Sequence, residues 1–123
     1  KVILGMPFYT RLWEDEKVDG KTKVTSKALS MAGIQKILDE KKPNIVWDEE
    51  SGQHYAQYTD NGKTYKVWIE DADSINLKSS LVYKYNLAGA AAWRRGFETE
   101  NIWPVIAQNL KKTDDSKHRA QAN

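Results

Sequence analysis

Two short apolar runs, one near each end of the chain, restrict the fold more than any other feature of the sequence. Residues 2–4 are aliphatic and are closed by Gly5 and Pro7, and residues 87–93 are small apolar residues ending in Trp93. Apolar runs without polar alternation are typical of strands buried on both faces of a parallel sheet. We therefore expect two barrel-type strands, with most of the chain lying between them.

The segment between these runs predicts a small α+β unit. Residues 14–23 are polar and contain Gly20, which indicates a surface loop. A helix is expected from Ser30, where the apolar residues Met31, Ile34, Ile37 and Leu38 recur at helical spacing, and Pro43 ends it.

Three aromatic and β-branched runs follow, at 44–48, 53–59 and 64–70. The dipeptides at 51–52 and 61–62 separate them, and the second is Asn-Gly, the strongest short signal for a hairpin. These runs predict an antiparallel meander.

Two further helices are expected. One is capped by Asp71 or Asp73 and places Ile75, Val82 and Tyr85 on one face. The other begins near Thr99 or Asn101 with Pro104 in its first turn, and buries Ile102, Trp103, Ile106 and Leu110. Residues 111–123 are polar and unpatterned, which predicts disorder or a linker.

Composition excludes several classes of function. Nineteen Lys and Arg against 17 Asp and Glu give a net charge of +2, with the signs interspersed, so a nucleic-acid partner is not expected. No apolar stretch is long enough for a membrane span. There is no cysteine, His54 and His118 are isolated in sequence, and phosphate-loop motifs are lacking, so neither a metal nor a cofactor is predicted. The chain starts at Lys1 with a strand pattern at once, as though inside a fold.

Four segments together carry a family resemblance: VILGMPFYTR at 2–11, VWDEESGQ at 46–53, WIEDADSI at 68–75 and LAGAAAW at 87–93. In this order and spacing the chain resembles the family-18 glycoside hydrolases, the chitinase-like TIM barrels. The resemblance implies an α+β insertion domain, an antiparallel meander with flanking helices, joined to the last two strands and last helix of a TIM (β/α)8 barrel. The implied divisions are 1–13 for strand seven and its loop, 14–86 for the insertion domain, 87–112 for strand eight and its helix, and 113–123 for a disordered tail.

The resemblance also implies the chemistry. Family-18 enzymes hydrolyse β-linked N-acetylglucosamine glycans, with the substrate acetamide as nucleophile and a Glu as acid. The family motif Asp-x-x-Asp-x-Asp-x-Glu does not occur here, so no catalytic residue is expected in this chain, and the acid is expected upstream. Carried over by position, Trp93 is the floor under the sugar, and Tyr9 and Arg11 are its polar contacts. The family usually has Gly where this chain has Thr10, which puts the local backbone angle in question.

Other candidates are less specific. Trp13 and Asp48 are expected at outer parts of the cleft, although each also fits a structural or solvated position, and a structural role is favoured for Trp47. From the bare sequence, Trp93 fits a core position as well as a cleft floor. Arg94 and Arg95 are candidates for binding a glycan carboxylate.

The full-length protein that contains this chain is expected to be a bacterial glycosidase, secreted or associated with the cell wall or spore, that acts on chitin-like chains or peptidoglycan. The expected partners of the chain are this glycan and the rest of the barrel. The alternatives are a lectin-like protein of the same fold that has lost its acid, and a free-standing α+β interaction module. The isolated chain is expected to be inactive.

Overall fold

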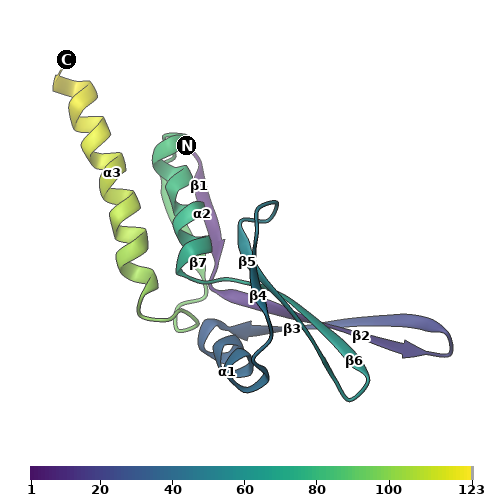
Figure 1. Cartoon of the computed structure of the whole chain (residues 1–123). Helices are drawn as coiled ribbons and strands as arrows, with labels where there is room; N and C mark the ends of the chain where they lie inside the picture. Colours follow the sequence, from purple (N-terminus) through teal and green to yellow (C-terminus); the bar gives the residue numbers. More distant parts are fainter. Residues whose placement is uncertain (123) are drawn as a thin grey trace.

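A computed structural model of the chain describes residues 1–122, which form two structural parts joined at one corner (Figure 1). The elements in chain order are β1 (Ile3–Pro7), β2 (Tyr9–Val18), β3 (Lys21–Ser30), α1 (Met31–Lys41), β4 (Ile45–Asp48), β5 (Gln53–Asp60), β6 (Lys63–Ile69), α2 (Ala72–Lys84), β7 (Gly89–Trp93) and α3 (Ile102–Ala122).

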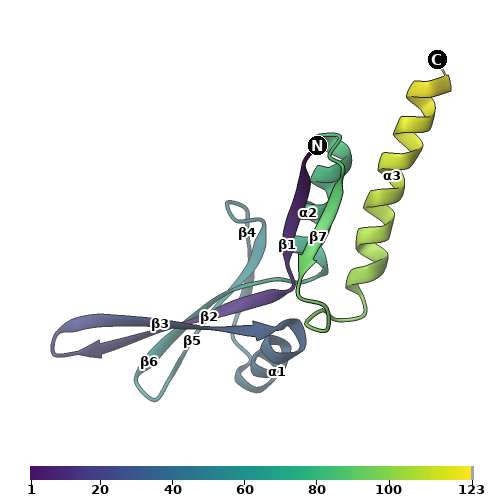
Figure 2. The ribbon, with the colours of Figure 1, turned by 180° about the vertical axis from the view of Figure 1, so that it is seen from behind.

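The first part contains the two strands expected from the apolar runs. β1 and β7 are parallel, with Ile3 opposite Gly89 and Pro7 opposite Trp93. Parallel pairing requires a long crossover, and residues between the strands supply it. Their carboxyl ends point towards the second part, and α2 and α3 lie on one side of the pair (Figure 2).

The sequence predicts that β1 and β7 are buried on both faces, but only one face of the pair is buried. The face towards α2 and α3 forms a core from Met6, Phe8, Met31, Ile75, Ile102 and Ile106. The other face is open, because Ile3 is 62% exposed and, among the described residues, β1 and β7 pair only with each other. Strands of this type need neighbours on both sides, which a complete barrel would provide.

The second part is a five-stranded antiparallel sheet with the order β3-β2-β6-β5-β4. The three predicted meander strands are β4, β5 and β6, and the predicted turns at 51–52 and 61–62 join them. α1 covers one face and packs through Ile34 and Leu38 against a second core that includes Leu12, Ala56, Val67 and Ile69. Within residues 1–122, no helix covers the opposite face (Figures 1 and 2).

The predicted loop at 14–23 is wrong, because these residues lie in the β2–β3 hairpin, with Val18 paired to Lys21. Asp19 and Gly20 have φ values of 50° and 76° and form its two-residue turn. Asp-Gly is a favoured sequence for such turns because both central residues need positive φ. The hairpin extends away from β1 and β7 (Figure 1), and β2 crosses the division expected between residues 13 and 14.

The helices begin as predicted, but three expectations about them are wrong. Ser30 and Asp71 cap α1 and α2 by accepting hydrogen bonds from Gly33 and Ser74. Tyr85, expected on the buried face of α2, is 63% exposed because it already lies at the C-cap. Trp103, expected on the buried face of α3, is 48% exposed. α3 continues through Ala122, where disorder or a linker was expected from 113; the segment has no Gly or Pro to end a helix.

Residue 123 lies outside the described residues. Within the described part of the chain, no helix has the length and apolar character needed to cross a bilayer.

Candidate sugar-binding site

A hollow of about 410 Å³ lies at the carboxyl ends of β1 and β7. Its lining comes from three elements and comprises Gly5, Met6, Pro7, Tyr9, Ala91, Ala92 and Trp93. Gly5 and Ala91 are opposite each other in the parallel ladder, and since Gly5 has no side chain and Ala91 only a methyl group, the floor of the hollow stays free. Carboxyl ends of parallel barrel strands are where ligands of such folds bind.

Trp93 is the dominant side chain of this hollow. It is 70% exposed, so the structure does not support the alternative position in a core. Its carbonyl oxygen accepts a hydrogen bond of 2.7 Å from the N–H of Phe8, and the peptide bond that follows it is cis. The backbone at the end of β7 is thereby tied to the start of β2, while the indole stays accessible.

Tyr9, Arg11 and Trp13 lie on the same face of β2, because alternate residues of a strand point to the same side. The residues between them, Thr10 and Leu12, are 2% and 4% exposed and point to the face covered by α1. The structure therefore brings together three of the predicted site residues on the uncovered face of the sheet. Trp13 belongs to a strand, not to the expected loop, and is 37% exposed.

Arg11 is held on this face by a neighbouring strand. Its Nη1 donates to Ser26 Oγ of β3 at 2.9 Å, so the guanidinium is oriented but remains exposed. A guanidinium has five N–H donors, which leaves four for a ligand. Arg94, by contrast, lies with its Cζ 4.5 Å from the ring centroid of Phe97.

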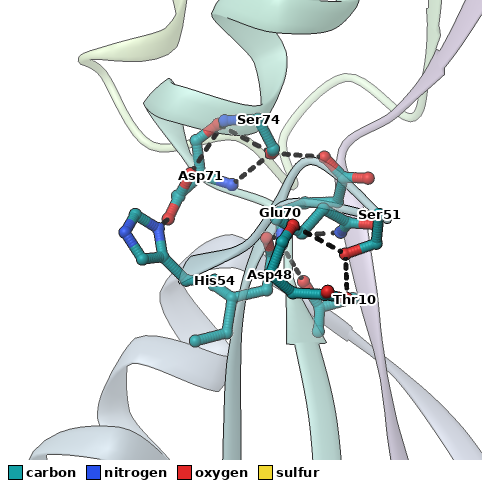
Figure 3. Close-up of polar contacts among 9 residues, drawn as sticks. Thr10, Asp48, Ser51, His54, Glu70, Asp71 and Ser74 are labelled. Atoms are coloured by element: carbon teal, nitrogen blue, oxygen red, sulfur yellow. Dashed lines mark hydrogen bonds and ion pairs between the residues drawn. The ribbon is translucent and has the colours of Figure 1, made fainter. Parts of the chain in front are cut away.

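Thr10 explains how β2 is positioned. Its Oγ1 accepts a hydrogen bond of 2.9 Å from the N–H of Glu70, and both residues are buried (Figure 3). The Glu70 carboxylate accepts from Ser74 Oγ at 2.6 Å and forms an ion pair with Lys78. The residue that departs from the family pattern thus points away from the hollow and links β2 to the start of α2.

Asp48 lies at the far side of the sheet, at the end of β4, and does not line the hollow. Its Oδ2 accepts from Ser51 Oγ at 2.7 Å and from Trp68 Nε1 at 3.2 Å. The Ser51 hydroxyl, together with the Trp68 indole N–H, holds the pKa of Asp48 below its ordinary value. The side chain is therefore a fixed carboxylate at neutral pH.

His54 is not isolated, contrary to the expectation from sequence. Its Nδ1 lies 2.8 Å from Asp71 Oδ2, and one ligand atom from each of His54, Asp71 and Asp73 falls within 4.8 Å of the others. Asp71 Oδ1 also accepts from the N–H of Ser74, so this carboxylate caps α2. Trp47 lies on the same side of the sheet as His54, at 4.9 Å between ring centroids, which is a structural position.

Three features of this region were not predicted from the sequence: Thr10 as an anchor, the buried Glu70, and Trp68 on the uncovered face. Thr10 and Glu70 are 60 residues apart, so no local pattern connects them. The position of Trp68 follows once the strand register is known, because Lys66 and Trp68 lie on the same face of the sheet as the odd-numbered residues of β2.

Comparison with known proteins decides the family. A family model described as "Glycosyl hydrolases family 18" matches residues 1–98. The chain belongs to glycosyl hydrolase family 18. Its mixed α+β fold, with an antiparallel sheet and few helices, matches that of a solved chitinase.

The most informative relatives of this family-18 chain are bacterial. It is 29% identical over 112 residues to the uncharacterized glycosylase YvbX of Bacillus subtilis, and 28% identical over 117 residues to a cortical fragment-lytic enzyme of the same organism. These matches cover 90% and 92% of the chain but 31% and 27% of the relatives. A chitinase structure from Chromobacterium violaceum superposes with a TM-score of 0.75 at 26% identity, over 88% of this chain and 32% of the chitinase. The chain thus spans about a third or less of the proteins it resembles.

Proposed function

We propose that this chain forms the floor and one wall of the substrate cleft of a family-18 glycosidase that hydrolyses β-linked N-acetylglucosamine glycans, either chitin-like chains or peptidoglycan. The observation that carries the proposal is the hollow between Tyr9 and the exposed Trp93 at the carboxyl ends of two parallel strands. The parent enzyme is proposed to be secreted or associated with the cell wall or spore, a proposal supported by the cortical fragment-lytic relative.

Each residue has a proposed task. The indole face of Trp93 packs against the axial C–H groups of the sugar at the cleavage site, which an aromatic face suits better than an aliphatic side chain. Tyr9 hydrogen-bonds the acetamide or a hydroxyl of the same sugar. Arg11 and Trp13, further along the same face of β2, contact the sugars that follow.

The chemical step requires residues that this sequence lacks. In the proposed retaining mechanism the substrate acetamide oxygen attacks the anomeric carbon, and a Glu protonates the leaving oxygen. No segment of the chain has the motif that carries this Glu, so the acid is assigned to the remaining barrel strands. This chain then contributes binding and orientation. Its proposed parts are strand seven and its loop at 1–13, the insertion domain at 14–86, and strand eight with its helix at 87–112, with β2 running across the first boundary.

The test is a titration of the whole chain with N-acetylglucosamine tetrasaccharide, followed by intrinsic tryptophan fluorescence and calorimetry. We expect binding of this ligand and not of the corresponding glucose tetrasaccharide, which lacks the acetamide. Trp93→Ala should weaken binding about tenfold or more, while its exposed side chain leaves stability nearly unchanged. Tyr85→Ala, an exposed aromatic on α2, is the matched control and should bind like the unmodified chain.

Two results would contradict the proposal. Equal affinity for both tetrasaccharides would remove the argument for an N-acetylated substrate, and product release by the chain alone would show that the acid is misplaced. The lectin-like alternative predicts the same binding by this chain. The two functions are distinguished by assaying the full-length protein: if it binds the tetrasaccharide without cleaving it, the lectin-like function is supported.

A further inference from the structure

The uncovered face of the insertion sheet carries an aromatic pair that lies outside the hollow. Trp68 of β6 and Tyr55 of β5 are directly opposite in the ladder, with ring centroids 4.9 Å apart and planes at 50°. Trp68 is 37% exposed although an aromatic side chain of its size is normally well buried. The same two strands hold a second pair, Tyr58 and Tyr65, which packs into the core beneath α1.

The indole of Trp68 is fixed in orientation. Its Nε1 donates to Asp48 Oδ2 at 3.2 Å, and the Asp48 carboxylate is itself held by Ser51 Oγ and the N–H of Glu50. Since the polar atom of the indole is already bonded, the exposed part of Trp68 is ring carbon. A fixed apolar ring beside a charged acceptor is an arrangement that binds a sugar, which presents C–H groups on one face and hydroxyls at its edge.

This pair is continuous with the hollow. Leu12 of β2 is paired with Val67 of β6, so the next residues on the uncovered face, Arg11 and Trp68, are neighbours across the two strands. Arg11 is two residues from Tyr9, which lines the hollow. From the spacing of strands and of residues along a strand, the Cα atoms of Tyr9 and Trp68 are about 8 Å apart. One extended glycan can therefore contact both.

We propose that Trp68, packed on Tyr55 and fixed by Asp48, is an outer platform for a second sugar of the glycan whose inner sugar lies on Trp93. This inference rests on the function proposed above and extends it. The carboxylate of Asp48 has lone pairs beyond those used by Ser51 and Trp68, and these accept a hydroxyl or amide N–H of the outer sugar. Asp48 thus acts at the outer sugar and not at the site of cleavage.

Ligands of different length distinguish binding at Trp93 from binding at Trp68. The whole chain is titrated with monomeric N-acetylglucosamine, which covers only one platform at a time, and with the pentasaccharide. Trp68→Ala should weaken pentasaccharide binding roughly three- to tenfold and leave binding of the monosaccharide at Trp93 unchanged. Trp93→Ala should weaken both, and Tyr85→Ala neither.

A second measurement does not depend on the folding of a variant. In the unmodified chain, the NMR signal of the Trp68 indole N–H should shift on adding pentasaccharide and stay in place on adding the monosaccharide at a concentration that fills the Trp93 site. A chain that binds both ligands through Trp93, yet shows no shift at Trp68 and no loss in Trp68→Ala, overturns this inference and leaves the proposed function intact. A chain that binds neither ligand overturns the proposed function itself.

Discussion

Replacing Thr10 by Val tests whether this residue anchors the strand that presents Tyr9 and Arg11. Valine has nearly the same shape, so the substitution opens no cavity, but it removes the acceptor of the Glu70 N–H. Thr10 is 2% exposed and Glu70 is 5% exposed, and the hydrogen bond between them is 2.9 Å long. Water cannot readily replace the lost partner at such a position.

The expected cost is that of a buried, unpaired backbone donor, about 1–3 kcal/mol in the free energy of unfolding. For a chain of this length such a change lowers the melting temperature by about 4 °C per kcal/mol. Urea denaturation followed by circular dichroism measures the first quantity, and hydrogen exchange at Glu70 should quicken in parallel. Thr22→Val, on the exposed part of β3, is the matched control and should change stability by no more than about 0.5 kcal/mol. If both variants unfold at the same urea concentration as the unmodified chain, the anchoring role of Thr10 is refuted.

Two further predictions concern carboxylates. Asp71→Ala should destabilise α2 by about 1 kcal/mol, because the N-cap bond to Ser74 is lost; a melting temperature equal to that of the unmodified chain would exclude a capping role. Because hydrogen bonds lower the pKa of Asp48, its charged form is favoured by the fold at neutral pH, and this stabilisation is lost as pH falls through the lowered pKa. Ser51→Ala should raise the pKa of Asp48 towards its ordinary value in a carbon-13 NMR titration, and an unchanged midpoint would show that Ser51 does not set it.

Much of the fold follows from local signals in the sequence. The Asn61–Gly62 turn, the Asp71 cap and Pro43 each act over a few residues, and each marks an element that the structure contains. The β2–β3 hairpin was missed although Asp19–Gly20 is an equally local signal, because the many charges of β2 resemble a solvated loop. Those charges are accommodated by ion pairs across strands, such as that of Lys63 with Glu14 at 2.7 Å.

The site could be predicted only as far as the family motifs extend. Tyr9 and Trp93 were predicted by position and both line the hollow, whereas Asp48 lies outside the hollow, where it accepts a hydrogen bond from Trp68. The Trp68 platform depends on which residues of β2, β5 and β6 are opposite one another. Register is a property of the assembled sheet, so a single strand sequence does not contain it.

The alternation along β2 has a consequence for how such a cleft changes over evolutionary time. Even-numbered positions such as Thr10 and Leu12 are constrained by the stability of the protein, whereas odd-numbered positions such as Arg11 and Trp13 face the solvent. Given the function proposed above, substitutions at odd positions change the surface offered to a glycan with little effect on folding. Every second residue of this strand is thus open to change without loss of the core.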